Sequence, residues 1–465
     1  MFQLHDKTRR KACLAAFLLL CVLPTTTVLA WCVYRHRPGY VDAEALRLSR
    51  ELGLEVSIER FQRLRPGSVL YEGMELTDPE SGRSVLRCRV LQAAWRDVAD
   101  ARGEKKPTLM LIASQPIVEV EAFDALGQLI ARRLRRRAGQ TAVDVRLTAA
   151  EVTLRAAEHS DTLTEFQGTI ETLPGGRQAR AHFRPTGSTT AEPVAIRLFR
   201  GHQTVPSTIA FELDTRGCTV PCRVLAMGFR PLEPLGLRSR FRGYVWAKQT
   251  PDADSAPPLW DGKMTGALLD VDLDDLISAN FPHTLSGTAT IEIQQARFQQ
   301  GRLESASGTL VAGPGLDGSG LDGLTMGTRA VIGRSLIDAA VEQLGLVRGL
   351  ESRTPGDLVP YEQLALAFLI DAEGLRLQGR SAVGGPGTVL VDRYGRLLST
   401  SDAYPRPVVA LLRALVPQSE VQVPATRQTD WLMRYLPIPD VTPPPTTDPP
   451  PPQVRLHFNA ETRSQ

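Results

Sequence analysis

Short segments in which apolar and polar residues alternate recur along most of this chain. They include residues 143–147, 152–155, 196–198, 209–213, 291–293 and 375–377. A period of two gives a β-strand one apolar and one polar face. Gly, Pro, Asp and Ser are frequent between the segments, as at 174–176 and 384–387, where the chain needs turns. The pattern predicts a large, mostly antiparallel sheet with one apolar face.

Helical patterns are few in comparison. A short amphipathic helix is expected over 41–54, and the others fall at about 122–137, 335–347, 405–416 and 427–436. The chain has 465 residues, which is enough for a substantial core. Roughly 20 strands at about 4.8 Å spacing would form a sheet on the order of 100 Å long. The expected fold class is therefore mainly β, with a few short packing helices.

An uncharged run near the N-terminus sets the expected location of the chain. Residues 12–34 are long enough to cross a bilayer as a helix, and Lys7, Arg9, Arg10 and Lys11 precede them. This basic flank predicts a cytoplasmic N-terminus, with the remainder of the chain translocated. The alternative is a signal peptide cleaved after Ala30, because residues 28–30 end in a small residue. Residues 1–38 are interpreted as a cytoplasmic stub and a transmembrane anchor.

Two changes in composition suggest further boundaries. Residues 249–258 hold three Pro and two Asp and are predicted to connect two β regions, 39–248 and 259–436. Residues 437–465 begin with two runs of Pro, which lack the backbone N–H that sheet pairing requires. This C-terminal segment is predicted to be extended and disordered.

No arrangement of residues indicates catalysis. Motifs of serine hydrolases, zinc peptidases and P-loop nucleotide-binding proteins are missing from the sequence, and the seven His are scattered singly. Residues 318–323 match a dinucleotide-binding fingerprint, but no βαβ alternation surrounds them and a flexible loop is the better interpretation. The formal net charge of +3 argues against nucleic acid as a partner. We expect no enzyme activity, no cofactor and no metal.

Two groups of side chains are candidates for binding or crosslinking. Cys218 and Cys222 are close enough in sequence for a local disulfide in an oxidising compartment, with pairing to Cys88 or free thiols as alternatives. Five arginines end the helix predicted near residue 123: Arg132, Arg133, Arg135, Arg136 and Arg137. Cations favour a helix C-terminus facing water, and contact with anionic lipid headgroups is the functional alternative.

The region after the anchor carries a recognisable pattern. Residues 46–58 read as a helix ending in Leu-Gly before a strand, residues 64–79 as a hairpin around Pro66-Gly67 and Asp78-Pro79, and residues 85–91 as a further strand. Residues 285–303 and 368–377 add similar strand and turn units. The chain in this respect resembles the AsmA-like envelope proteins, the group that includes TamB. The resemblance implies a curled, taco-like sheet in the periplasm, held at the inner membrane by a single-pass anchor.

The same resemblance implies a role in handling or transferring lipid during outer-membrane biogenesis. A sheet with one continuous apolar face must cover it with helices, a second sheet or an apolar ligand. The residues expected to line an apolar groove are Val143, Val145, Leu147, Ile291 and Ile293. The alternative is that the two β regions pack as closed sandwiches. The protein would then be a membrane-tethered scaffold that binds other envelope proteins.

Overall fold

The computed structural model describes residues 6–35, 38–99, 103, 105–135, 143–156, 160–188, 190, 192–202, 208–222, 235, 238–250, 259–314, 330–349, 356–401 and 404–416.

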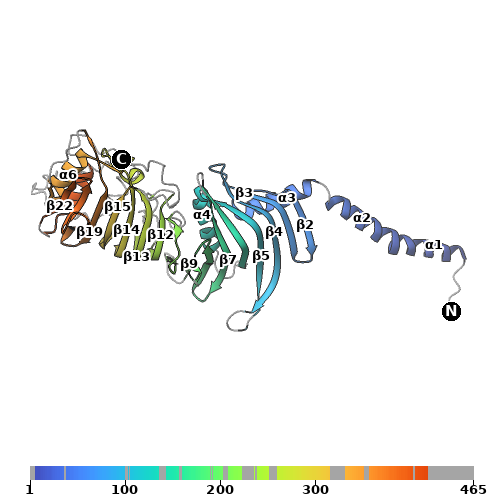
Figure 1. Ribbon diagram of the computed structural model, residues 1–465. Helices are drawn as coiled ribbons and strands as arrows, with labels where there is room; N and C mark the ends of the chain where they lie inside the picture. The colour runs from blue at the N-terminus through green and yellow to red at the C-terminus, as the bar shows by residue number, and fades with distance from the viewer. Residues whose placement is uncertain are drawn as a thin grey trace, which may run out of the picture.

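One sheet of twenty strands runs through most of the molecule (Figure 1). Its N-terminal half consists of β1 (Glu55–Ser57), β2 (Arg60–Arg65), β3 (Ser68–Thr77), β4 (Ser84–Ala99), β5 (Lys105–Glu119), β6 (Asp144–Arg155), β7 (Ser160–Leu173), β8 (Gly176–Pro185) and β9 (Val194–Gly201). Its C-terminal half consists of β10 (Ile209–Asp214), β11 (Val220–Pro221), β12 (Arg240–Thr250), β13 (Leu259–Asp272), β14 (Thr288–Gln299), β15 (Arg302–Gly313), β17 (Leu346–Arg348), β19 (Gln363–Asp371), β20 (Gly374–Gly379), β21 (Thr388–Asp392) and β22 (Gly395–Thr400). The predicted β-dominated fold is confirmed.

The sheet is mostly antiparallel, as predicted, but it contains one parallel pairing that was not predicted from the sequence. Strands β5 and β6 pair in parallel over Thr108–Glu119, whereas the other pairings are antiparallel. The physical reason is the length of the connection, because a parallel neighbour requires a crossover longer than a hairpin turn. Here helix α4 (Phe123–Arg135) lies in that crossover. The helix predicted over 122–137 therefore changes the direction of the next strand.

The two predicted β regions belong to the same sheet. Most of the predicted connector, residues 251–258, lies outside the described residues. The strands on either side of it, β12 and β13, are paired along their length, from Arg240 opposite Leu269 to Thr250 opposite Leu259. The connector therefore joins two neighbouring strands, and backbone hydrogen bonding continues across it.

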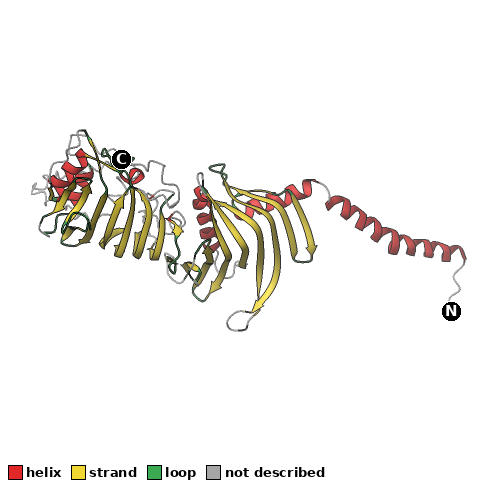
Figure 2. Ribbon diagram, viewed as in Figure 1, coloured by secondary structure: helices red, strands yellow, loops and turns green. Residues whose placement is uncertain are grey.

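Bulges bend individual strands of the sheet. Gln115 in β5, Glu165 in β7 and Asp270 in β13 have φ near +50°, and the register shifts at the last two. Such bulges increase the local twist and bend a strand. Strands β4 and β5 are visibly curved (Figure 2). The sheet stays open, because β1 and β2 at its N-terminal edge pair only with β3 among the described strands.

Further elements lie at the two ends of the sheet. Helix α3 (Pro38–Leu52) lies beside the first strands, where Tyr40 packs against Phe61 with ring centroids 5.4 Å apart. At the other end are α6 (Arg334–Leu344), α7 (Val409–Leu415) and a separate pair of strands, β16 (Val331–Gly333) and β18 (Leu358–Pro360). The helix predicted over 427–436 and the proline-rich tail lie outside the described residues.

A helix at the N-terminus meets the requirements of a membrane span. Its elements are α1 (Asp6–Phe17), a π-helical turn over Leu18–Val22 and α2 (Leu23–Arg35). Within them Arg10–Val33 forms 24 residues of mean hydropathy 2.3, and none of the 18-residue window is buried. Pro24 follows the π-helical turn, consistent with its missing N–H. The hydroxyls of Thr25 and Thr26 donate to the carbonyls of Cys21 and Val22, at 2.6 and 2.8 Å.

Candidate functional site

The register of the sheet places an apolar row on one face. Starting in β3, each residue of this row is paired with the next one in the neighbouring strand, and none of them is polar. The apolar row consists of Val69, Ala93, Leu111, Leu147, Gly168, Ala181, Ile196, Leu213, Val245, Met264, Ala296, Ala306, Ile370 and Leu375. Because paired residues point to the same side of a sheet, this face is apolar from β3 to β20.

Burial along the apolar row changes abruptly between β9 and β10. The seven members from Val69 to Ile196 are half-buried. The members from Leu213 to Leu375 are buried, and none of them is more than 8% exposed. The neighbouring row repeats the change, since Val145, Ile170 and Leu198 are half-buried but Phe211 and Ala247 are buried. Along the apolar row, incomplete burial is therefore confined to the N-terminal half, although Ile291 and Ile293 of β14 on the same face are also half-buried.

The residues predicted to line a groove lie on this apolar face. Val145 and Leu147 belong to β6, Ile291 and Ile293 to β14, and all four are half-buried. Val143 precedes β6 and is also half-buried. The polar neighbour Glu292 is exposed, as expected for the opposite face. Asp144 and Arg146 are half-buried, in part because an Asp144 carboxylate oxygen accepts a hydrogen bond from the N–H of Thr172.

Helix α4 lies over the N-terminal half of the apolar face. It contacts β4, β8 and β9, and Phe123 and Leu134 at its two ends are buried. Leu126, Leu129 and Ile130 between them are only half-buried. The helix and the strands beneath it therefore both retain accessible apolar surface.

A buried arginine holds the C-terminal end of α4 to the sheet. Arg177 of β8 is 2% exposed and lies on the apolar face, at the same alternation as Ala179 and Ala181. Its guanidinium donates to the carbonyl of Arg133 at 2.6 Å and to that of Val143 at 2.9 Å. Arg177 thereby donates to a carbonyl in the last turn of α4, where the helix itself supplies no N–H donor. This residue was not predicted from the sequence, although an arginine at a strand position that otherwise alternates as apolar was a signal in the sequence.

The arginine cluster at the end of α4 makes contacts within the protein. Arg132 is exposed and donates to the carbonyl of Gly53 at 3.3 Å, just after α3. Burial and, secondarily, the charge of Arg135 lower the pKa of Arg200. Arg133 is half-buried, while Arg136 and Arg137 lie outside the described residues. The structure thus brings Arg135 near a further arginine, and the contact with lipid headgroups stays a prediction.

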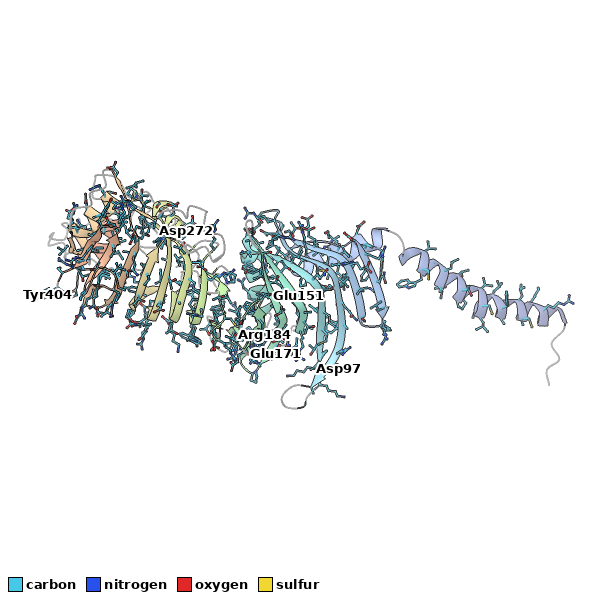
Figure 3. The ribbon with its side chains drawn as sticks, in the orientation of Figure 1. Asp97, Glu151, Glu171, Arg184, Asp272 and Tyr404 are labelled. Carbon is cyan, nitrogen blue, oxygen red and sulfur yellow. The ribbon has the colours of Figure 1, made fainter. Side chains whose placement is uncertain are left out.

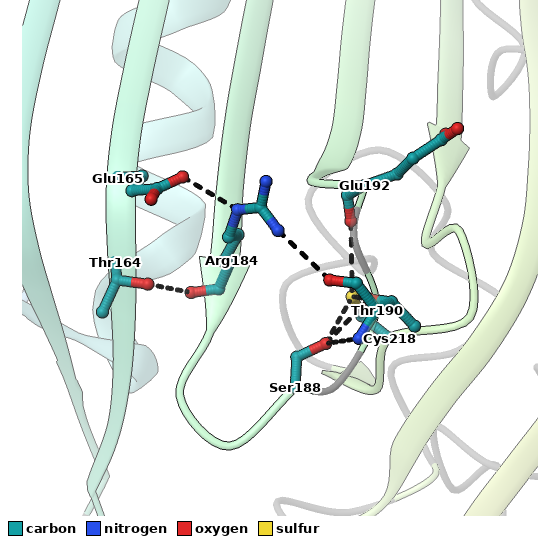
Figure 4. Close-up of polar contacts among 7 residues, drawn as sticks. All are labelled: Thr164, Glu165, Arg184, Ser188, Thr190, Glu192 and Cys218. Atoms are coloured by element: carbon teal, nitrogen blue, oxygen red, sulfur yellow. Dashed lines mark hydrogen bonds and ion pairs between the residues drawn. The ribbon is translucent and has the colours of Figure 1, made fainter.

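A polar pocket of about 410 Å³ lies between the ends of β7, β8 and β12. Arg240 pairs with Asp161 across it, at 2.8 Å. Half of the other lining residues carry hydroxyl groups: Ser160, Thr162, Thr186, Ser188, Thr190 and Thr219. Figure 4 shows one wall, where Ser188 and Thr190 contact the sulfur of Cys218 at 3.1 and 2.8 Å.

The predicted disulfide is not formed in this structure. Cys88, Cys218 and Cys222 are free and buried. Cys218 instead uses its sulfur for hydrogen bonds with the two hydroxyls in Figure 4. Burial raises the pKa of Cys222 to about 11 and also raises that of Cys88. Thiols in such surroundings are poorly nucleophilic.

The remaining chemistry of the described residues is sparse. They contain no group of three His, Cys, Asp or Glu side chains that could hold a metal ion. Acidic side chains are dispersed over the surface, as the positions of Asp97, Glu151 and Asp272 show (Figure 3). The dinucleotide-like residues 318–323 lie outside the described ranges. The apolar face is therefore the strongest candidate site.

Comparison with known proteins identifies no family and no relative for this chain. No protein-family model matches the chain, and no curated protein matches it with significant similarity. The functional interpretation therefore rests on the sheet and its apolar row.

Proposed function

We propose that this protein binds the acyl chains of lipids on the half-buried part of its apolar row. It would do so as a membrane-anchored, AsmA-like protein of the bacterial cell envelope, with the sheet in the periplasm. The observation that carries the proposal is the unbroken apolar register from Val69 to Ile196, combined with half-burial at every position. Moving lipid between membranes would be the corresponding physiological role.

The chemistry of the face favours a lipid over a small polar ligand. Leu111, Leu147 and Ile196 lie on neighbouring or nearby strands, so an extended chain could contact several of them in turn. Each fully buried aliphatic side chain contributes roughly 1.5–3 kcal/mol when it leaves water. A half-buried one still has part of that free energy to gain from a ligand. An acyl chain needs no hydrogen-bond partners, and the apolar row offers none.

Photocrosslinking in the full chain tests the proposal. A photoreactive amino acid at Ile196 should capture co-purifying phospholipid, identified by mass spectrometry. The same group at the adjacent Arg197 is the matched control, because Arg197 is exposed and points to the other face. A third position, Val245, belongs to the buried half of the row and should capture none.

The outcomes separate the two functional classes. Lipid captured at Ile196 but not at Arg197 supports the groove. A folded protein that captures no lipid at Ile196 contradicts it. If Ile196 then crosslinks a defined envelope protein, the membrane-tethered scaffold becomes the better interpretation.

A further inference from the structure

Basic and apolar side chains gather at one end of the first strands. The turn between β2 and β3 lies beside β4, where the N–H of Trp95 donates to the carbonyl of Gly67 at 2.9 Å. The long β4–β5 hairpin extends beyond this point, and Asp97 marks it in Figure 3. We define the rim as residues 63–68 together with 95–99 and 105–106.

Two large apolar side chains of the rim are exposed. Trp95 is 50% exposed and Leu64 is 51% exposed. Trp95 is the partner of Leu109 and continues the apolar face to its end, because Leu91, Ala93 and Trp95 share one side of β4. Leu64 falls at the register shift between Arg63 and Arg65, which turns it away from the regular pairing.

The rim is also basic. Arg63, Arg65, Arg96 and Lys105 are exposed, and Lys106 is half-buried. The rim residues 63–68, 95–99 and 105–106 contain five Lys or Arg and one Asp, a net charge of 5 − 1 = +4. The whole chain of 465 residues has a formal net charge of only +3, so the rim is locally much more basic than the chain as a whole.

From these observations we propose that the rim is a second membrane contact, which binds the surface of a bilayer rich in anionic phospholipid. Trp between Lys and Arg is the composition of membrane interfaces, where the ring lies at headgroup depth and the cations attract anionic lipids. The rim also lies at one end of the half-buried part of the apolar face. A lipid leaving the bilayer at Trp95 would meet Leu109 and then Val145, its partners in β5 and β6.

This inference rests on the proposed anchoring but is tested separately from the groove. The full chain is reconstituted into vesicles of phosphatidylcholine alone or with 30% phosphatidylglycerol (about one anionic lipid in three, to give a strong negative surface). A photoreactive amino acid at Leu64 reports contact with lipid. Tyr404, which is 76% exposed at the far end of the sheet, is the control position.

Crosslinking to lipid at Leu64 should require phosphatidylglycerol and should decrease in high salt. Charge removal in R63Q/R65Q/K105Q should weaken binding on the order of a hundred-fold, since each of the three cations contributes roughly five-fold at an anionic surface and the factors multiply. R63K/R65K should retain it. Equal yields at Leu64 in both vesicles, or at Leu64 and Tyr404, would overturn the rim contact. Capture at Ile196 then shows independently whether the groove survives.

Discussion

The two halves of the sheet carry the same apolar row but cover it differently. From Val69 to Ile196 the row is half-buried, and from Leu213 to Leu375 it is buried. The strands themselves alternate in the same way in both halves. Covering elements contribute to this burial: Ile332, Ile337 and Val408 belong to the same apolar cluster as Ile370 and Leu375. Phe123 of α4 belongs to it as well, but Leu126 of the same helix is only partly buried.

This difference separates a partly accessible apolar face from a structural core. In the C-terminal half the apolar residues are committed to packing and stabilise the fold. In the N-terminal half, α3 and α4 cover the apolar row incompletely. Part of the free energy of removing its side chains from water is therefore still available. A ligand can gain that free energy only where apolar side chains remain partly exposed, which along the apolar row is from β3 to β9.

The largest expected effect comes from placing a charge in each half of the row. V245D buries an unpaired carboxylate at a position with no exposure and should lower the free energy of unfolding by about 4 kcal/mol. I196D places the carboxylate at a half-buried position and should lower the free energy of unfolding by only about 1 kcal/mol. It should also abolish lipid capture. Chemical denaturation and crosslinking are measured on both variants. Similar losses of stability would remove the distinction between the halves.

A close approach of two strands provides the next test of the buried half. Gly243 and Gly266 face one another in β12 and β13 with φ of +156° and +137°. A Cβ on Gly243 would lie 2.1 Å from the carbonyl oxygen of Thr265, so G243A must push the strands apart. We expect the free energy of unfolding to decrease by an amount on the order of 2–4 kcal/mol. The matched control is G39A, where nothing lies within 4 Å, and an equally stable G243A would show that these strands can separate.

A third prediction concerns how α4 is held over the open half. R177M keeps much of the side-chain volume but removes both donors to the carbonyls of Arg133 and Val143. The expected decrease in the free energy of unfolding is about 2 kcal/mol. Hydrogen exchange should become faster in α4. The control is R180M, since Arg180 lies on the other face of β8 and donates to Gln178. Unchanged exchange in α4 would show that Arg177 does not position it.

Sequence alternation predicted the strands and the face, but could not predict how the face is covered. Val145 and Val245 occupy similar patterns, and only the structure shows that one is half-buried and the other buried. The parallel pairing of β5 with β6 was missed because a local pattern contains no strand direction. Trp95 and Leu64 were overlooked because the rim forms only when a turn and a distant hairpin meet.

The smallest expected effect is a pH dependence that distinguishes the halves by their histidines. His283 is buried beside Ser335 of α6, with Nδ1 3.0 Å from the hydroxyl, and burial lowers its pKa. His182 of β8 is half-buried, and burial with the nearby Arg197, Arg216 and Arg180 lowers its pKa as well.

Above pH 6.5, the ordinary pKa of histidine, both residues are neutral in the folded and unfolded chain and their contribution to stability is complete. On acidification the unfolded chain binds protons first, so the free energy of unfolding falls until each folded pKa is reached. H283Q should flatten this decline, so that the opening free energy obtained from hydrogen exchange near α6 and α7, after correction for the intrinsic exchange rate, no longer depends on pH between about 7 and 5. H182Q should do the same for β8 and β9. Exchange that responds to both variants equally throughout the molecule would mean that the two halves open as one cooperative unit.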